Sequence, residues 1–240
     1  MVWAGLAAVA ALTFIWFLVP FAYRKYEENR LARLCRDQKT IVLSYDDGPG
    51  ETLTPLLLDL LLEHRAQATF FFLGRNVEGK TDIAQRLISE GHEIGSHTQD
   101  HSNAWKTEPW RVARDLRSGI RTVETLGGDA KLFRPPYGKL TIVGLLDGLA
   151  GALRFGWWTV DSRDSWDRRP VEDVVAEVAA KGGGVVLMHD FDRYGPPSNG
   201  VSHIDHVLAL TKGLLDCAER SGYRVRRLTD VYKTAAEQRG

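Results

Sequence analysis

Short apolar runs alternate with longer amphipathic stretches from Thr40 to the end of the chain. Short runs rich in β-branched and aromatic residues are typical of buried strands, and apolar residues three and four positions apart are typical of helices. The predicted strands are Thr40–Tyr45, Ala68–Leu73, Glu93–Ser96, Leu132–Arg134, Phe155–Val160, Gly184–Met188 and Arg224–Leu228. The predicted helices are Leu53–His64, Asp82–Glu90, Pro109–Leu126, Thr141–Leu153, Val171–Ala180 and Val207–Ser221. Because strands and helices alternate, successive strands are expected to run parallel with helical crossovers, which predicts an α/β barrel.

The segment before this domain has a different pattern. Residues 1–23 contain no charged side chain, and a helix of that length spans about 30 Å, the thickness of a bilayer hydrocarbon core. The basic start and small-residue cleavage site of a signal peptide are both missing, so we expect an uncleaved transmembrane anchor. Residues 24–39 are expected to form a charged, helical juxtamembrane linker, and residues 40–240 the catalytic domain.

Charge flanking the expected anchor predicts its orientation. Basic residues follow the apolar segment and none precedes it; they are Arg24, Lys25, Arg30, Arg33 and Arg36. The positive-inside rule therefore favours a cytoplasmic catalytic domain.

Overall composition excludes some partners. Lys and Arg total 31, Asp and Glu total 31, and the isoelectric point is near 7.1. With no basic stripe interleaved with aromatic residues, no nucleic-acid partner is expected. Cys35 and Cys217 are predicted to be free thiols. The oligomeric state is not indicated.

Candidate chemistry begins with two acids and two histidines. Asp46 and Asp47 close the first predicted strand, and His97 and His101 follow the third. Two imidazoles and one carboxylate, with an open position for water, are typical of a hydrolytic metal centre. We expect Asp47, His97 and His101 to bind a divalent metal, with zinc the first candidate and cobalt, nickel or manganese also compatible. Asp46 is then free to act as a general base.

Three further polar segments also follow strand-like runs. They are Arg134-Pro135-Pro136-Tyr137-Gly138, Asp161-Ser162-Arg163-Asp164-Ser165-Trp166 and Leu187-Met188-His189. In α/β barrels, functional groups collect where strands end. The sequence therefore predicts one site built from distant segments.

Taken together and in this order, these motifs resemble the five motifs of the NodB-homology polysaccharide deacetylases, carbohydrate esterase family 4. The resemblance covers residues 40–232 and implies a distorted (β/α) barrel with fewer than eight regular units. One departure from the family pattern is Ser165, which separates Asp164 from Trp166. It leaves open whether Asp161 or Asp164 pairs with His189.

The chemistry expected of this site is hydrolysis of an amide. His189 is expected to protonate the leaving nitrogen, with Asp161 beside it to raise its pKa, and Arg134 is expected to keep Asp46 ionised. The resemblance implies that the backbone N–H of Tyr137 helps to hold the oxyanion. Pro136, Tyr137, Trp166 and Leu187 are expected at the substrate, the last two as an apolar wall around the acetyl methyl.

The predicted function is metal-dependent removal of an N-acetyl group from an amino sugar in a polysaccharide, oligosaccharide or lipid-linked glycan. One alternative is deformylation or deacetylation of a polyprenyl-linked sugar at the cytoplasmic face. A metal- or glycan-binding pseudoenzyme is a third reading, but it requires a missing catalytic group, and every expected group is present.

Overall fold

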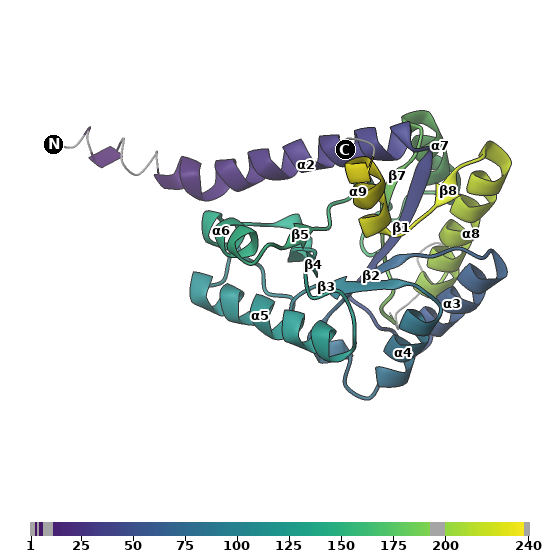
Figure 1. The fold of residues 1–240 in the computed structure, drawn as a ribbon, viewed down its shortest axis with the longest axis horizontal. Coiled ribbons are helices and arrows are strands. Elements are labelled where there is room, and N and C mark those ends of the chain that lie inside the picture. The colour runs from purple at the N-terminus through teal and green to yellow at the C-terminus, as the bar shows by residue number, and fades with distance from the viewer. Residues whose placement is uncertain (1–2, 4, 7–11, 193–199, 238–240) are drawn as a thin grey trace.

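The strands form one curled parallel sheet in the computed structural model, which describes residues 3, 5–6, 12–192 and 200–237 (Figure 1). Within these residues the sheet has eight strands, in the order β5-β4-β3-β2-β1-β7-β6, with β8 pairing β1. Their bounds are β1 Thr40–Asp46, β2 Thr69–Phe72, β3 Glu93–Ser96, β4 Leu132–Phe133, β5 Arg154–Phe155, β6 Val160–Asp161, β7 Gly184–His189 and β8 Arg224–Val225. Every described strand pair is parallel, as the alternating pattern predicts.

Helices cover both faces of this sheet. Those following Thr40 are α3 Leu53–Glu63, α4 Thr81–Ser89, α5 Pro109–Thr125, α6 Ile142–Ala150, α7 Val171–Lys181, α8 His203–Ser221 and α9 Leu228–Glu237. Side chains of β1 alternate between two cores: Ile41, Leu43 and Tyr45 face the one packed by α3, α4, α7 and α8, and Val42 faces the other. This alternation is the period of two of a strand buried on both sides.

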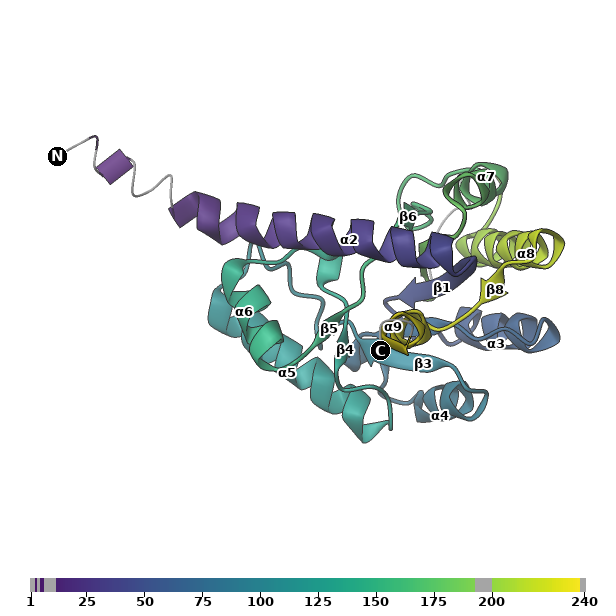
Figure 2. The ribbon, with the colours of Figure 1, turned by 45° about the horizontal axis from the view of Figure 1, so that its top comes forward.

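The second core is closed by a helix from before the predicted domain. Helix α2 (Val19–Asp37) follows a π-helical turn, η1 (Phe14–Leu18), and crosses the sheet beside α9 (Figure 2). Leu31 and Cys35 of α2 are fully buried in that core. The charged helix expected at residues 24–39 is therefore present, but it packs against the sheet instead of standing apart from it.

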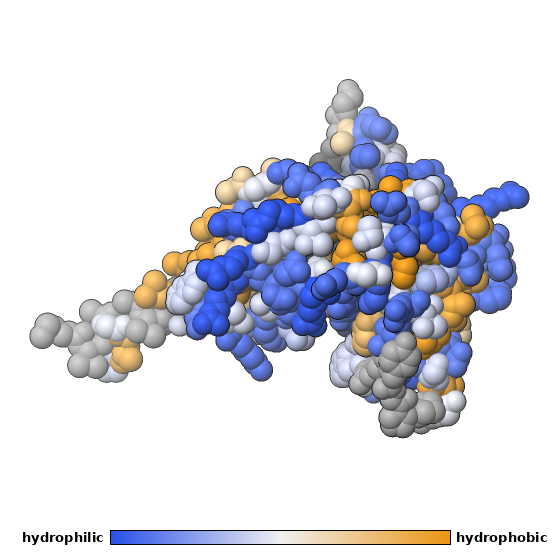
Figure 3. All heavy atoms as spheres, turned by 90° about the horizontal axis from the view of Figure 1, so that it is seen from below, coloured by the Kyte–Doolittle hydropathy of each residue, from blue (hydrophilic) through white to orange (hydrophobic). Residues whose placement is uncertain are grey.

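The expected transmembrane helix is not supported. Among the described residues, no helix combines the length and the apolar character needed to cross a membrane. Part of the predicted anchor, residues 1–2, 4 and 7–11, lies outside the described residues. Exposed apolar side chains do gather on the protruding N-terminal part of the chain, including Phe14, Leu18 and Phe21 (Figure 3).

Two predicted strands differ from the structure. Phe155–Val160 is divided between β5 and β6, which lie at opposite ends of the sheet order. The connecting residues span the gap between those edges, where the backbone carbonyl of Gly156 accepts from Arg134 and Trp157 is fully buried. Arg224–Leu228 ends early because Leu228 begins α9, a helix that the sequence did not predict.

The structure also describes the two cysteines and the start of helix α8. Both cysteines are free and buried, as predicted. Helix α8 begins earlier than expected, capped by Ser202, whose side chain accepts from the backbone of Asp205. His203 and His206 lie in the first turn of α8, and both are buried.

Candidate active site

The predicted site residues converge at the carboxyl ends of the parallel strands. There they line a cleft of about 430 Å³. The lining residues are Asp46, Asp47, His97, His101, Tyr137, Trp158, Asp161, Ser165, Trp166, Leu187 and His189. The sequence motifs that are far apart along the chain are thus brought together in space.

Asp47, His97 and His101 form a compact group. Oδ1 of Asp47 lies 3.5 Å from Nε2 of His97 and 3.4 Å from Nε2 of His101. The three ligand atoms all lie within 4.8 Å of one another. Nδ1 of His97 donates to the backbone carbonyl of Arg134 at 2.8 Å, which turns its Nε2 towards the other two groups.

The chemistry of this group fits a divalent cation. Oδ1 of Asp47 is buried without a hydrogen-bond partner, although a buried carboxylate oxygen ordinarily needs one. Burial lowers the pKa of His97 to about 3, against the opposing charge of Asp47. Burial also lowers the pKa of His101. Both imidazoles are therefore neutral near pH 7, and neutral imidazole is the form that binds a metal.

Asp46 lies beside this group and is bound differently. Its Oδ1 accepts from Arg134 at 2.7 Å, and its Oδ2 is 3.8 Å from Nε2 of His97. Arg134 is fully buried, and also donates to Gly156 and Ser44. Burial raises the pKa of Asp46 above its ordinary value, and the charge of Arg134 opposes this only in part. The expected ion pair is present, but burial has a larger effect on the pKa of Asp46 than the charge of Arg134 has.

His189 is paired with Asp164, not with Asp161. Nδ1 of His189 lies 2.9 Å from Oδ1 of Asp164, and its backbone N–H donates to Oδ2 at 2.9 Å. Asp161 instead accepts from the backbone N–H of Arg163. Asp164 is held in place by the backbone N–H of His189, which donates to its Oδ2, and by the Ser162 hydroxyl, which lies 2.9 Å from its Oδ1. The motif left the partner open between Asp161, the first expectation, and Asp164, and the partner in the structure is Asp164.

Asp164 strongly changes the proton affinity of His189. Burial by itself would lower the pKa of His189, but the charge and hydrogen bond of Asp164 outweigh it and raise the pKa to about 10. Asp46 and Asp47 act in the same direction. His189 is therefore protonated near pH 7 and can donate a proton.

Aromatic and apolar side chains form the walls of the cleft. The ring of Tyr137 lies 4.5 Å from that of His101, centroid to centroid, and Trp166 and Leu187 line the cleft as expected. Pro136 is buried in the short helix Pro136–Gly138 and is not among the lining residues. Trp158 was missed because it lay within a predicted strand. In the structure Trp158 lies in the segment between β5 and β6, and Gly156, directly after β5, was the available signal that the predicted strand is interrupted.

Three residues of this site have a left-handed backbone conformation. Asp47, His101 and Tyr137 have φ values of 70°, 62° and 58°. Non-glycine residues rarely adopt this left-handed region, and they do so mainly where function or surrounding structure requires it. Two expected ligands and the expected oxyanion donor are thus held in costly conformations.

Comparison with known proteins places these features in a family. A family model of polysaccharide deacetylase matches residues 33–143. A peptidoglycan-N-acetylglucosamine deacetylase of Bacillus cereus is 34% identical over 201 residues, covering 82% of this chain and 90% of the relative. A chitooligosaccharide deacetylase of Bradyrhizobium is 31% identical over 201 residues, covering 81% and 91%.

Solved structures agree with the sequence matches. The crystal structure of the Bc1960 peptidoglycan N-acetylglucosamine deacetylase has a TM-score of 0.72 at 28% identity and covers 82% of this chain and 89% of its own. A T48 deacetylase with substrate has a TM-score of 0.68 at 30% identity, covering 83% and 94%. The chain therefore belongs to the NodB-homology polysaccharide deacetylases of carbohydrate esterase family 4.

Proposed function

We propose that this protein is a metal-dependent hydrolase that removes the N-acetyl group of an amino sugar in a polysaccharide, oligosaccharide or lipid-linked glycan. The observation that carries the proposal is the cleft itself. It joins the compact group Asp47, His97 and His101 to a second carboxylate, Asp46, and to a protonated imidazole, His189. The family supports the same class of reaction, carbohydrate N-deacetylation.

The residues that would hold the metal are Asp47, His97 and His101. A divalent cation bound there would lower the pKa of a coordinated water and polarise the acyl oxygen. Zinc remains the first candidate from the ligand types, with cobalt, nickel and manganese compatible. The unpartnered oxygen of Asp47 and the fixed tautomer of His97 support this assignment.

Asp46 acts as the general base. It lies beside the proposed ligands, and its raised pKa makes it a better proton acceptor than an ordinary aspartate. Arg134 occupies one of its oxygens and so leaves the other to receive the proton of the attacking water.

His189 acts as the general acid. Hydrolysis breaks the bond between the acyl carbon and the sugar nitrogen, and the nitrogen must gain a proton to leave as an amine. The protonated imidazole supplies that proton, and Asp164 holds the ring in place through Nδ1. The products are acetate and a free amino sugar.

The remaining residues position the acyl group. The backbone N–H of Tyr137 is the proposed oxyanion donor, held by the left-handed conformation of that residue. Trp166 and Leu187 are the proposed wall around the acetyl methyl, and Trp158 extends that wall.

Mass spectrometry of products tests this function. Protein loaded with zinc is incubated with N-acetyl chitooligosaccharides, peptidoglycan fragments and lipid-linked N-acetyl sugars, and acetate and free amine are measured. At least one substrate should lose about 42 mass units, because one acetyl group is replaced by hydrogen. We expect no reaction after the metal is removed by a chelator. Activity that is unchanged by complete metal removal would disprove the metal dependence.

His97→Ala tests the ligand assignment. It should lower metal affinity and activity by at least about tenfold, because it removes one of three ligands and the loss of a residue that only supports a ligand already costs about 10- to 100-fold. Metal content measured by atomic emission checks this, and His206→Ala is the matched control, since His206 lies on α8 outside the cleft and outside the groups that could hold a metal ion. Stoichiometric metal in the His97 variant would refute the assignment.

A polyprenyl-linked sugar at the cytoplasmic face is the second candidate substrate. Two observations favour it: the exposed apolar side chains of the N-terminal segment and the basic residues that follow them. The proposal is a membrane-anchored protein whose catalytic domain faces the cytoplasm. In intact cells, Arg111→Cys should then resist a membrane-impermeant thiol reagent and react after lysis, because Arg111 has an exposed side chain.

The parent chain is the control for this labelling. Cys35 and Cys217 are buried, and burial raises the pKa of Cys35 to about 12, so neither should react. Labelling of the variant in intact cells would place the domain outside the cytoplasm and favour wall glycan as substrate.

A further inference from the structure

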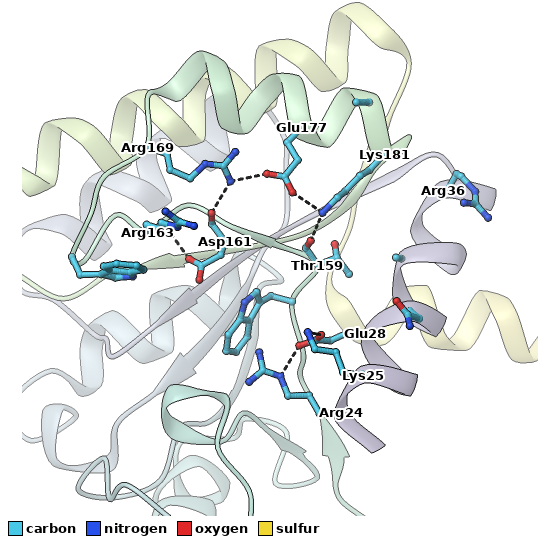
Figure 4. Close-up of a pocket in the computed structure, with 15 residues that line it drawn as sticks. Arg24, Lys25, Glu28, Arg36, Thr159, Asp161, Arg163, Arg169, Glu177 and Lys181 are labelled. Atoms are coloured by element: carbon cyan, nitrogen blue, oxygen red, sulfur yellow. Dashed lines mark hydrogen bonds and ion pairs between the residues drawn. The ribbon is translucent and has the colours of Figure 1, made fainter. Parts of the chain in front are cut away.

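A second cavity of about 890 Å³ lies next to the catalytic cleft (Figure 4). We call it the basic groove. In the close-up α2 runs along the right side and carries Arg24, Lys25 and Glu28 at its lower end, and the upper wall is formed by α7 and the segment before it, with Arg169, Glu177 and Lys181. The family motifs alone do not account for this groove, because six of its fifteen lining residues come from α2.

Positive charge is in excess among the described residues that line the groove. Six are cations and three are acids. Glu28 is shared by Arg24 at 2.6 Å and Lys25 at 2.7 Å, and Glu177 is shared by Arg169 and Lys181, both at 2.6 Å. Each of these acids therefore balances only one of its two cations.

The remaining charges offset this excess only in part. Asp161, the third acid, accepts from the backbone N–H of Arg163 at 2.9 Å. Arg163 and Arg36 contact Asp167 and Asp37, which lie outside the groove, and both pairs are well exposed to solvent. Exposed pairs are weak and are screened by salt, so these two guanidinium groups can exchange partners with a ligand.

The groove adjoins the catalytic cleft and shares part of its wall. Trp158, Asp161 and Trp166 line both cavities. Trp166 is 69% exposed, so one face of its indole is open to a ligand. A sugar with its acyl group in the cleft can therefore extend its neighbouring substituent directly into the groove.

The boundary between the two cavities is shaped by this chain's departure from the family motif. Ser165 is the extra residue before Trp166, and it lines the cleft. Arg163, in the same loop, has a φ of 55°, and its guanidinium lies 5.2 Å from the ring centre of Trp166. This loop thus presents an aromatic face and a cation side by side.

We propose that the basic groove binds a phosphate or diphosphate group attached to the amino sugar whose N-acyl group lies in the cleft. The proposal rests on the proposed function, because it places that sugar in the catalytic cleft. Guanidinium groups bind phosphate oxygens through paired N–H donors, and lysine adds a compact charge. A solvent-accessible groove with an excess of positive charge attracts such an anion and raises its local concentration. The shared chemistry is a sugar phosphate ester, whether its other end is a nucleotide or a lipid.

Calorimetry measures the contribution of the phosphate without relying on catalysis. N-acetylglucosamine and N-acetylglucosamine 1-phosphate are titrated into the full chain in the presence of a chelator, and the ratio of their Kd values is the phosphate advantage. We expect it to be about tenfold at low salt and smaller at high salt, because the groove's charges are partly exposed. The double variant Lys25→Glu with Arg163→Glu should reduce it below about threefold.

A matched control separates the groove from overall charge. Arg33→Glu with Arg111→Glu makes the same change in net charge at exposed positions outside the groove, one of them also on α2. This control should keep the phosphate advantage. If the double groove variant fails to fold, Arg163→Gln alone is used, with thermal melting as the check. A ratio near one in the parent chain, or an equal loss in the control, would overturn the proposal.

N-acetylmuramic acid provides a further arm. It carries a carboxylate on a lactyl ether at O3 and no phosphate at C1, and an equal advantage for it would show that the groove attracts any anionic sugar and would overturn the assignment to phosphate. The two phosphate sources are distinguished by acetate release from uridine diphosphate N-acetylglucosamine and from polyprenyl diphosphate N-acetylglucosamine in micelles. A higher kcat/KM for either one, lost in the groove variant, supports the proposal and identifies the source.

The groove assignment and the proposed function fail in different ways. Acetate release from neutral oligosaccharides without any phosphate advantage would refute the groove and leave the proposed function standing. A phosphate advantage without acetate release from any substrate would refute the function and leave the groove standing.

Discussion

Asp46 and Asp164 are both buried and both paired with a cation, yet their proton affinities differ. Asp46 is 3% exposed and Asp164 is fully buried. Burial raises the pKa of Asp46, and Arg134 does not fully offset this. Burial acts on Asp164 in the same direction, but the charge and hydrogen bond of His189 prevail and lower its pKa.

The number of donors accounts for this difference. Asp164 accepts from the ring and the backbone of His189 and from the hydroxyl of Ser162. Asp46 accepts from Arg134 through one oxygen, while its other oxygen faces the proposed metal group. Donors that bind the charged form hold a carboxylate ionised, and a carboxylate with fewer donors takes up a proton more readily. Burial alone therefore does not assign an acid to a role.

The largest effect is expected from Asp46→Asn. Removing the proposed base should lower kcat/KM by about 10²- to 10⁴-fold, while the three proposed ligands keep the metal. Acetate release and metal content, measured on the same preparation, check this. If metal is lost in proportion to activity, Asp46 is a metal ligand, and its assignment as the general base is wrong.

Asp164→Asn should have the next largest effect, about 10²-fold on kcat. His189 acts when protonated, so activity falls as pH rises through its pKa. Without the charge of Asp164 that raises it, this pKa should fall, and the alkaline limb of the profile should move to lower pH. Asp161→Asn is the matched control and should leave the limb in place, since Asp161 makes no described hydrogen bond to His189.

Arg134→Lys should cost about tenfold, because lysine keeps the charge but not the three hydrogen bonds of the guanidinium. Asp46 acts when ionised, so activity rises with pH through its pKa. Loss of the hydrogen bond should raise that pKa further and move the acidic limb to higher pH. An acidic limb that stays fixed would show that Arg134 supports structure without tuning Asp46.

Ser162→Ala should have the smallest effect, about two- to threefold. It removes one of the donors to Asp164, but the Ser162 hydroxyl also contacts the carbonyl of Leu187 and cannot serve both acceptors at once. The alkaline limb should shift only slightly towards lower pH. A loss as large as that of Asp164→Asn would show that the loop, not the carboxylate, positions His189.

Much of this site could be predicted because its residues come from short motifs at strand ends. Asp47, His97 and His101 are brought together wherever the strands β1 and β3 are parallel and close in the sheet. The partner of His189 could not be decided in this way. Asp161 and Asp164 are both near the end of β6, and the choice depends on how one loop turns back on Ser162.

The fold was predictable to the same extent. The spacing of apolar residues, with glycine and proline between the runs, predicts where the strands lie, but it does not predict which strands pair. The run Phe155–Val160 reads as one strand by composition, whereas its two ends belong to opposite edges of the sheet. Likewise, the charges of residues 24–39 predicted an exposed helix, because the few apolar positions, Leu31 and Cys35 among them, give only a narrow buried stripe.

The buried apolar positions of α2 limit how far the N-terminus can be truncated. A recombinant chain beginning at Thr40, where the motifs begin, would lack α2 and uncover the core residues that Leu31 and Cys35 contact. It would also lose the hydrogen bond from Arg24 to the carbonyl of Gly138, next to Tyr137. A useful truncation therefore removes residues before Val19 and retains the whole of α2, so that the expressed product keeps both its packing and its substrate-facing wall.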